Sequence, residues 1–203
     1  MFWRRIEKEK ATPGKASKYS DWKPELAKEA SHRCVYCSIF EGHFGGQRNF
    51  HVEHFRPKSL REDLTMVYAN LFYACGICNI FKSDDWPSEP KAGDYSFIHY
   101  PDPSQTDYSD FLAIDASGLV ASQSVTGRYI IEQLHLNRPQ MVINRRLIAL
   151  VNELTALSGE LEQYVQADNQ PDDMKELVSV FASIITLLKE LWFAVPYEAK
   201  QTR

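Results

Sequence analysis

The sequence predicts an α+β fold in which a small cysteine-bearing core of two short strands precedes a mainly helical C-terminal half. All four cysteines lie between residues 34 and 78, and two short apolar segments with strand composition lie between the two cysteine pairs. Residues 123–203 instead show the 3.6-residue periodicity of amphipathic helices. With 203 residues, the chain has room for one domain with an extension or for two small domains.

The composition excludes several classes of protein. Hydrophobic residues make up 44% of the chain and charged residues 25%, which is typical of a folded protein and not of a disordered one. No apolar run reaches the roughly 18 residues that a membrane span needs. The basic start MFWRRIEKEK is not followed by an apolar segment, so no secretory signal is predicted and a cytoplasmic location is expected.

The net charge of −4 argues at first against a nucleic-acid ligand, but the charge is unevenly distributed. Residues 1–33 carry a net charge of +4 and residues 34–83 a net charge of +1, whereas residues 84–203 carry −9. The first part of the chain is therefore the part expected to face a polyanion.

Residues 1–33 are predicted to form a basic arm or irregular lead-in followed by a helix. Residues 1–20 are polar and basic with a Pro-Gly pair, and residues 22–32 follow as a helix with Pro24 in its first turn.

Residues 34–85 are predicted to form the core. Residues 51–55 have strand composition and are ended by Pro57, and residues 70–75 form a second apolar strand candidate. The second cysteine pair then opens a short helix.

The remaining chain divides into two parts. Within residues 86–122, a loop rich in Pro and Asp leads to a hairpin at 111–122 that turns at Asp115–Gly118. Residues 123–203 are predicted to be helical and to end in two long antiparallel helices separated by residues 169–172. The wide apolar stripe of the last helix favours core packing, while docking of a partner or a second copy stays open.

Two CxxC pairs predict a metal site. Cys34 and Cys37 form the first pair, Cys75 and Cys78 form the second, and 37 residues separate them. Four thiolates in this spacing are typical of a closed structural zinc site. A redox pair or four unrelated thiols are the alternatives.

A group of polar residues between and after these pairs suits phosphodiester hydrolysis. His54 can deprotonate a water, because the pKa of a histidine lies near neutrality. Glu53 and Asn79 offer the hard oxygen donors that Mg²⁺ or Mn²⁺ prefers. Lys82 can add positive charge against the transition state.

The run CVYC…HVEHFRPKS…NLFYACGICNIFK resembles the HNH endonucleases in their zinc-ribbon form, over about residues 34–85. The resemblance implies a ββα-metal motif, in which two strands and a helix surround one divalent ion. It implies that His54 is the general base, that Glu53 and Asn79 are metal ligands, and that Asn70 orients the loop bearing the histidine. Lys82 matches a basic residue common on the helix of that family.

The motif departs from the usual pattern at three positions. Asn79 makes it H-N-N, which the family tolerates, and Glu53 stands where Asp is usual. His51 is an extra histidine, either a strand residue facing solvent or a further metal ligand. Strand alternation would place His51 and Glu53 on one face and His54 on the other, unless the strand bends.

Non-catalytic interpretations exist for each of these residues. Glu53 and His54 could form an ion pair at a strand end, Asn70 could serve a turn, and Asn79 could cap a helix. Two further cations, Arg56 and Lys58, are candidates for phosphate contacts or plain surface charge.

The chain also resembles small HNH proteins of bacterial defence operons, through Asp102-Pro103 and the segment Leu136-Asn-Arg-Pro139. That weaker resemblance implies a role in anti-phage defence and an ATPase-type partner subunit. A homodimer through the C-terminal helices is the alternative.

These observations together predict a metal-dependent HNH endonuclease that hydrolyses DNA. Two alternatives remain: a zinc-ribbon module that binds nucleic acid or protein without cleaving it, and an RNA nuclease.

Overall fold

The computed structural model describes residues 2–8, 14, 16–166 and 171–192. The chain divides into two compact units, Met1–Met141 and Val142–Arg203. The first unit mixes short strands with short helices and contains all four cysteines, whereas the second is helical. The α+β class predicted from the sequence is therefore confirmed.

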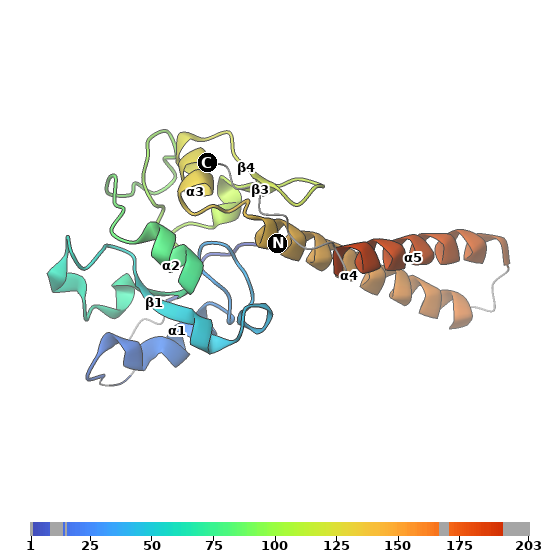
Figure 1. Ribbon diagram of the computed structural model, residues 1–203, viewed down its shortest axis with the longest axis horizontal. Coiled ribbons are helices and arrows are strands. Elements are labelled where there is room, and N and C mark those ends of the chain that lie inside the picture. Colours follow the sequence, from blue (N-terminus) through green and yellow to red (C-terminus); the bar gives the residue numbers. More distant parts are fainter. Residues whose placement is uncertain (1, 9–13, 15, 167–170, 193–203) are drawn as a thin grey trace, which may run out of the picture. The chain divides into compact units, whose positions relative to one another are not determined.

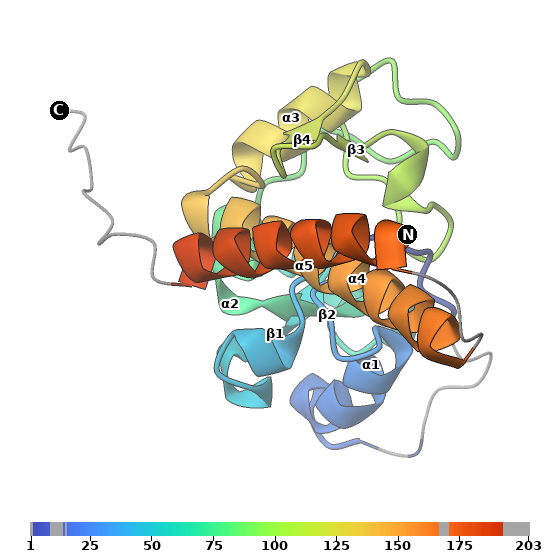
Figure 2. The same cartoon turned by 90° about the vertical axis from the view of Figure 1, so that its right-hand side faces the viewer.

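An antiparallel hairpin organises the first unit. β1 (Phe50–His54) pairs with β2 (Leu71–Cys75) along their whole length. Both predicted strands are thus present: the first is displaced by one residue, and the second begins one residue later than expected and ends at Cys75 as predicted. α1 (Lys23–Glu29) and α2 (Gly76–Lys82) both pack on the hairpin, which lies between them in both views (Figure 1 and Figure 2). All five side chains of β2 are buried, as its apolar sequence requires.

The helix predicted at 22–32 is shorter than expected. A 3₁₀ turn at Tyr19–Trp22 precedes α1, and Pro24 lies in the first turn of the helix. Beyond Glu29 the chain turns, because Ser31 and His32 adopt left-handed backbone angles with φ of 47° and 58°. This reversal directs the chain into the first cysteine pair.

The N-terminal residues 2–8 form no helix or strand, but two of their side chains are packed in the core. Trp3 and Ile6 are each only 5% exposed. The Trp3 indole Nε1 donates to the Tyr36 carbonyl at 2.8 Å, and the Ile6 N–H donates to the Pro103 carbonyl at 2.8 Å. Two apolar side chains three residues apart thus anchor a segment that its basic composition did not mark as buried.

The chain between α2 and the second unit contains a small hairpin and a helix. β3 (Ala113–Ile114) pairs with β4 (Val120–Ala121), and the Asp115 carboxylate accepts backbone hydrogen bonds inside the turn. The hairpin predicted at 111–122 is therefore present. α3 (Val125–Gln133) follows, capped by the Ser124 hydroxyl, which accepts from the Gly127 N–H at 2.9 Å.

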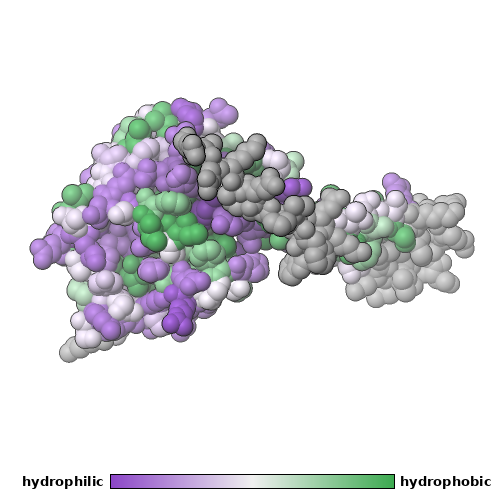
Figure 3. All heavy atoms as spheres, in the orientation of Figure 1, coloured by the Kyte–Doolittle hydropathy of each residue, from purple (hydrophilic) through white to green (hydrophobic). Residues whose placement is uncertain are grey.

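α4 (Pro139–Gln166) starts at the end of the first unit and continues into the second, where α5 (Pro171–Trp192) joins it. The two long helices expected there are present, while Asn169 and Gln170 of the expected turn lie outside the described residues. Figure 3 shows apolar residues among the surface atoms of this unit. Five large apolar side chains are at least 37% exposed: Val151, Val178, Val180, Phe181 and Leu187. None of the helices, as far as they are described, combines the length and apolar composition needed to cross a bilayer.

Candidate functional site

The four cysteines form one buried cluster. Their sulfur atoms all lie within 4.8 Å of one another, and Cys37 Sγ is 3.7 Å from Cys75 Sγ. Sulfurs placed tetrahedrally at about 2.3 Å from a zinc ion would lie about 3.8 Å apart, whereas a disulfide requires about 2.05 Å. The cluster predicted from the two CxxC pairs is therefore present, and its dimensions suit a metal such as zinc.

The first cysteine pair lies in a tight turn. The Cys34 N–H donates to the Ile39 carbonyl at 3.0 Å, and the Ser38 N–H donates to the Cys34 carbonyl at 2.9 Å. Ser38 closes the turn with a left-handed φ of 57°. Burial raises the pKa of the Cys34 thiol well above its usual range, so a bound cation is needed to hold it ionised.

The second cysteine pair lies where β2 passes into α2. Cys75 ends the strand and caps the helix, and its sulfur accepts from the Cys78 N–H at 3.5 Å. The two pairs are joined through the sheet, because the Val35 N–H donates to the Tyr73 carbonyl of β2 at 2.9 Å.

A cleft of about 630 Å³ opens beside this cluster. Five of the residues singled out from the sequence line it: His51, Glu53, His54, Lys58 and Asn79. Asn70, Lys82 and Arg56 do not line it. Within the described residues, the four cysteines are the only group of three or more His, Cys, Asp or Glu side chains close enough to share an ion. The His, Asp and Glu side chains of the cleft are therefore not gathered around one point as the four sulfurs are.

His54 is held in one tautomer by the backbone. Its Nε2 lies 3.1 Å from the Thr65 carbonyl oxygen. Because a carbonyl only accepts, Nε2 carries the proton and Nδ1 keeps the free lone pair. Burial lowers the pKa of His54, and the nearby Lys58 and Lys82 lower it further, while the bond to Thr65 acts in the opposite direction. The lowered pKa favours the neutral ring, whose Nδ1 lone pair can then accept a proton.

The Tyr19 ring packs edge-on against His54, with the two ring centroids 4.6 Å apart. This contact fixes the plane of the imidazole. Sequence reasoning missed Tyr19, because no motif connects a residue of the N-terminal segment with a strand residue 35 positions later.

Glu53 is buried against a lysine. Its Oε1 lies 2.8 Å from Lys82 Nζ and accepts from the Tyr36 hydroxyl at 3.1 Å. Burial raises the pKa of Glu53, although Lys82 and Tyr36 act against that rise. Oε2 makes no hydrogen bond or ion pair with any residue that the structure describes, and Glu53 lines the cleft. One carboxylate oxygen thus anchors the side chain, and the other is free to bind a ligand.

Lys82 lies in the core and does not face the cleft. Its side chain is completely buried, and its Nζ lies over the rings of Trp86 and Tyr100 at 5.8 and 5.3 Å from their centroids. It also donates to the His54 carbonyl at 3.4 Å. Lys82 therefore holds Glu53 and the end of β1 in place.

The two asparagines occupy different environments. Asn70 is buried and grips the backbone of Arg56: its Oδ1 accepts from the Arg56 N–H at 2.9 Å, and its Nδ2 donates to the Arg56 carbonyl at 3.1 Å. It thereby fixes the turn that follows His54. Asn79 follows Cys78 on α2 and is partly exposed in the cleft wall.

His51 is exposed and lies against the start of α2. A β-carbon built on Gly76 would approach His51 Nε2 to 3.1 Å and the Asn49 carbonyl oxygen to 3.3 Å. The ring of His51 thus packs over a residue that lies between the two cysteines of the second pair.

The two cations proposed from the sequence differ in their surroundings. Arg56 lies outside the cleft, and its Nη2 is 2.8 Å from Glu89 Oε2 in an ion pair. Lys58 is exposed in the cleft wall, with its Nζ 5.2 Å from the centre of the Tyr19 ring. Lys58 Nζ donates a long, exposed hydrogen bond to the Tyr19 hydroxyl at 3.5 Å and can still meet an anion, whereas an anion at Arg56 would compete with Glu89.

Three further charged residues line the cleft without having been predicted: Lys23, Arg48 and Asp84. Lys23 and Arg48 come from segments outside the motif and carry no signal of their own in the sequence. Asp84 follows Lys82 by two residues, so its place just after a helix that bears a candidate ligand could have indicated it.

Comparison with models of known protein families finds none that matches this chain, and a search of curated proteins finds no significantly similar one. The functional interpretation therefore depends on the residues and contacts of the chain itself.

Proposed function

We propose that the chain is a metal-dependent endonuclease of the HNH kind that hydrolyses phosphodiester bonds in DNA. The observation that carries this proposal is the bond from His54 Nε2 to the Thr65 carbonyl, which leaves a basic Nδ1 on a histidine of the cleft. The succession of β1, β2 and α2 supports a ββα-metal arrangement, because it supplies Glu53 and His54 from the first strand and Asn79 from the helix.

In the proposed reaction, His54 takes a proton from a water through Nδ1, and that water attacks the phosphorus atom. The lowered pKa of His54 keeps the ring neutral and ready for this step. Asn70 and Tyr19 do not touch the substrate. They are positioning residues that fix the turn after His54 and the plane of its ring.

The proposed divalent ion, Mg²⁺ or Mn²⁺, would be held by Glu53 through Oε2 and by the Asn79 amide oxygen. When bound, such an ion supplies charge neutralisation at the phosphate and at the leaving 3′ oxygen. Lys82 keeps Glu53 oriented from behind by its contact with Oε1. Asp84 and His51 line the same cleft, but together with Glu53 they do not lie close enough to share one ion, so the three could not act as ligands together without moving.

The cysteine cluster is proposed to hold a structural zinc ion. All four of its ligands come from the protein, which leaves no position for a substrate. Its role is to join the first cysteine turn to the junction of β2 and α2, and so to place Asn79 beside β1.

Cations on the cleft wall support a polyanionic substrate. Lys23, Arg48 and Lys58 line the cleft, and each can contact a backbone phosphate. Their number is small, so the affinity for DNA should fall as the salt concentration rises but with a shallow slope.

Cleavage of nucleic acid tests the proposal directly. The purified chain is incubated with supercoiled plasmid or with RNA in Mg²⁺, Mn²⁺ or EDTA. We expect metal-dependent cleavage of the plasmid, and we expect His54→Ala to slow it by about 10²–10⁴-fold, the usual contribution of a general base. His43→Ala serves as the matched control, because His43 is an exposed histidine outside the cleft.

Each other result assigns a different function. Cleavage of RNA alone makes the protein an RNA nuclease. Metal-dependent binding without cleavage by either the wild type or His54→Ala makes it a binding module. Equal cleavage by the wild type and His54→Ala removes the proposed role of His54.

A partner is proposed at the helical unit, where the exposed apolar side chains of α4 and α5 support docking of another chain. A second copy or an ATPase-type subunit of a defence system are the two candidates. Light scattering of the purified chain distinguishes the two candidates. A dimer that Val178→Glu dissociates indicates a second copy, whereas a monomer favours the ATPase-type subunit.

A further inference from the structure

Arg138 lies against the cysteine cluster, although it is 101 residues from Cys37 in sequence. Its Nη2 donates to Cys37 Sγ at 3.4 Å, to Cys78 Sγ at 3.7 Å and to Cys75 Sγ at 3.9 Å. One guanidinium nitrogen thus contacts three of the four sulfurs. None of the roles in the proposed reaction uses this residue.

The same guanidinium is fixed from its other side. Nη1 donates to the carbonyls of Leu134 and His135, each at 3.2 Å, at the end of α3. These carbonyls lie at the negative end of the helix, which favours a cation there. Leu134 and Leu136 are fully buried and anchor the segment that delivers Arg138.

The neighbour of Arg138 ties this segment to the small hairpin. The Asn137 side chain accepts from the Val120 N–H at 2.7 Å and donates to the Val120 carbonyl at 2.9 Å. Pro139 then begins α4. The sequence Leu136-Asn-Arg-Pro139 therefore joins the cysteine cluster, β4 and the start of α4.

The cluster has a chemical need for such a cation. A zinc ion with four thiolates carries a net charge of −2, and the sulfurs are buried. Hydrogen bonds from an outer residue to metal ligands orient those ligands and tune the metal. A guanidinium suits this task better than an ammonium, because its fork donates in several fixed directions at once.

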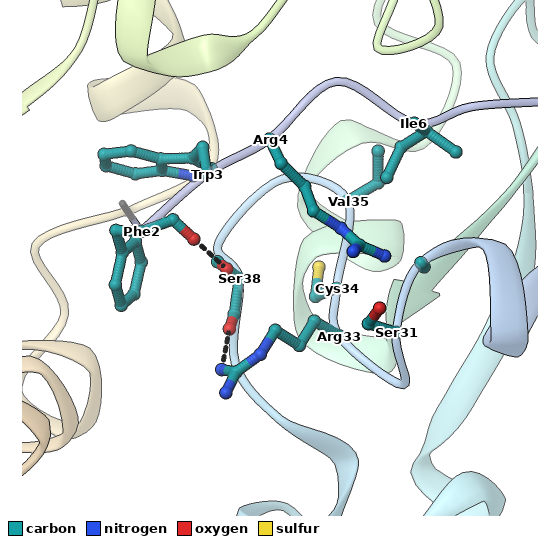
Figure 4. A pocket seen from close by; sticks show the side chains of 10 residues that line it. Phe2, Trp3, Arg4, Ile6, Ser31, Arg33, Cys34, Val35 and Ser38 are labelled. Atoms are coloured by element: carbon teal, nitrogen blue, oxygen red, sulfur yellow. Dashed lines mark hydrogen bonds between the residues drawn. The ribbon is translucent and has the colours of Figure 1, made fainter.

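Cys34 is the one sulfur ligand that Arg138 does not contact. It lies instead in the wall of a cavity of about 220 Å³ between residues 2–6 and the first cysteine turn, as Figure 4 shows. The cluster is therefore asymmetric, with a cation over three sulfurs and a small cavity beside the fourth.

We propose that Arg138 is a positioning residue of the zinc site, whose guanidinium neutralises and orients the thiolates of Cys37, Cys75 and Cys78. This proposal rests on zinc occupying the cluster. Loss of Arg138 should then weaken retention of the metal by about 10–100-fold, as loss of an outer partner of metal ligands generally does.

Zinc release and cobalt absorption test the proposal in the full chain. Zinc transfer to a colorimetric chelator is timed for the wild type, Arg138→Met and Arg138→Lys, with Arg128→Met as the control. Arg128 suits this purpose because its guanidinium donates to the Gln123 carbonyl, away from the cluster. We expect release to be about 10–100-fold faster in Arg138→Met, intermediate in Arg138→Lys and unchanged in the control.

The cobalt-substituted protein gives a readout that a purely structural role would not move. Hydrogen bonds stabilise sulfur lone pairs, so their removal should shift the sulfur-to-cobalt charge-transfer band to longer wavelength in Arg138→Met. Arg138→Lys should restore part of the shift. Should Arg138→Met not fold, Arg138→Lys alone carries the test, because one ammonium cannot donate to three sulfurs and two carbonyls together.

Two outcomes overturn the proposal at different levels. A folded Arg138→Met variant with one zinc per chain, the wild-type release rate and an unshifted band shows that Arg138 does not act on the cluster. Purified wild-type protein without zinc overturns the zinc site itself and the role of Arg138 with it. Neither outcome affects the test of cleavage by His54.

Discussion

The cysteine cluster and the cleft are neighbours, since Cys78 and Asn79 are consecutive residues of α2, yet they are built in different ways. All four cysteines are buried, and their sulfurs already lie at distances suited to one ion. The proposed ligands of the cleft are spread around an open cavity, and only one oxygen of Glu53 is anchored. A closed site suits a metal that stays, whereas an open site suits an ion that arrives with its substrate.

The cations beside the two sites follow the same division. Lys82 and Arg138 both stand behind ligands, but Lys82 has one carboxylate oxygen as its ionic partner while Arg138 contacts three sulfurs. Removing Lys82 should therefore affect the cleft more than the cysteine cluster, and removing Arg138 should affect the cysteine cluster more than the cleft.

The largest expected effect is on the closed site. Cys75→Ser removes a ligand, and because structural zinc contributes about 10–16 kcal/mol of binding free energy, the first unit should fail to fold stably. Circular dichroism during thermal unfolding, together with zinc analysis, measures this. Asn79→Ala, four residues along the chain, should melt within a few degrees of the wild type. Similar melting of Cys75→Ser and the wild type would contradict a structural metal.

The next effect concerns the buried ion pair behind the cleft. Lys82→Met leaves the Glu53 carboxylate buried without its cation, which should cost about 3–5 kcal/mol of the free energy of unfolding. Urea unfolding measures the loss. Lys82→Met combined with Glu53→Gln should recover part of it, because the uncompensated charge is then gone. Strictly additive losses in the double variant would show that the two residues do not depend on each other.

A smaller effect is expected at Asn70. Asn70→Ala removes both hydrogen bonds to the partly buried N–H and carbonyl of Arg56, at a cost of about 1–3 kcal/mol. Cleavage should fall as well, since the turn that follows His54 loosens. Asn49→Ala is the control, because Asn49 makes one exposed bond to the Phe44 carbonyl. Wild-type stability of Asn70→Ala in urea would exclude its positioning role.

The smallest effect is a displacement of the pH profile. Because burial lowers the pKa of His54, cleavage should rise with pH around a midpoint below about 6.5, the ordinary histidine value. Tyr19→Ala exposes the ring and should move the midpoint upward, whereas Tyr19→Phe keeps the ring contact and should not. NMR titration of His54 provides the same pKa without cleavage, and an identical midpoint in all three proteins contradicts the assigned contact.

The same shift has a consequence for stability. The pKa of His54 is lower in the folded than in the unfolded state, so the unfolded state binds more protons between the two values. The contribution of His54 to stability is therefore complete above about pH 6.5 and is lost as the pH falls from there through the folded pKa.

Features set by short-range spacing could be predicted from the sequence. The two CxxC pairs predicted the cysteine cluster, and Pro57 and the apolar run before Cys75 predicted both strands to within one residue. The turn at Asp115 was equally local. In each case the information lies within a few residues, where turn chemistry and strand composition decide the structure.

Contacts between distant segments could not be predicted. The burial of Trp3 depends on the Tyr36 carbonyl, and the place of Arg138 depends on the thiolates brought together by the fold. Glu53 was expected as a metal ligand or as the partner of His54, because its spacing gives no sign that Lys82 lies beneath it. The packing of a polar segment or of a charged side chain depends on contacts with distant residues. The periodicity of the sequence gives no information about which residues those are.

The contact of Gly76 with His51 limits how the cleft can be transplanted. A designer who grafts only β1 and its histidines onto another scaffold loses the neighbour over which His51 packs, and a side chain at position 76 would press on that ring and on the Asn49 carbonyl. Gly76 in turn lies between Cys75 and Cys78, whose geometry belongs to the cysteine cluster. A graft of the cleft must therefore include the hairpin, α2 and both cysteine turns. It must also include Arg138, which is far from these elements in the sequence but contacts three of the sulfurs.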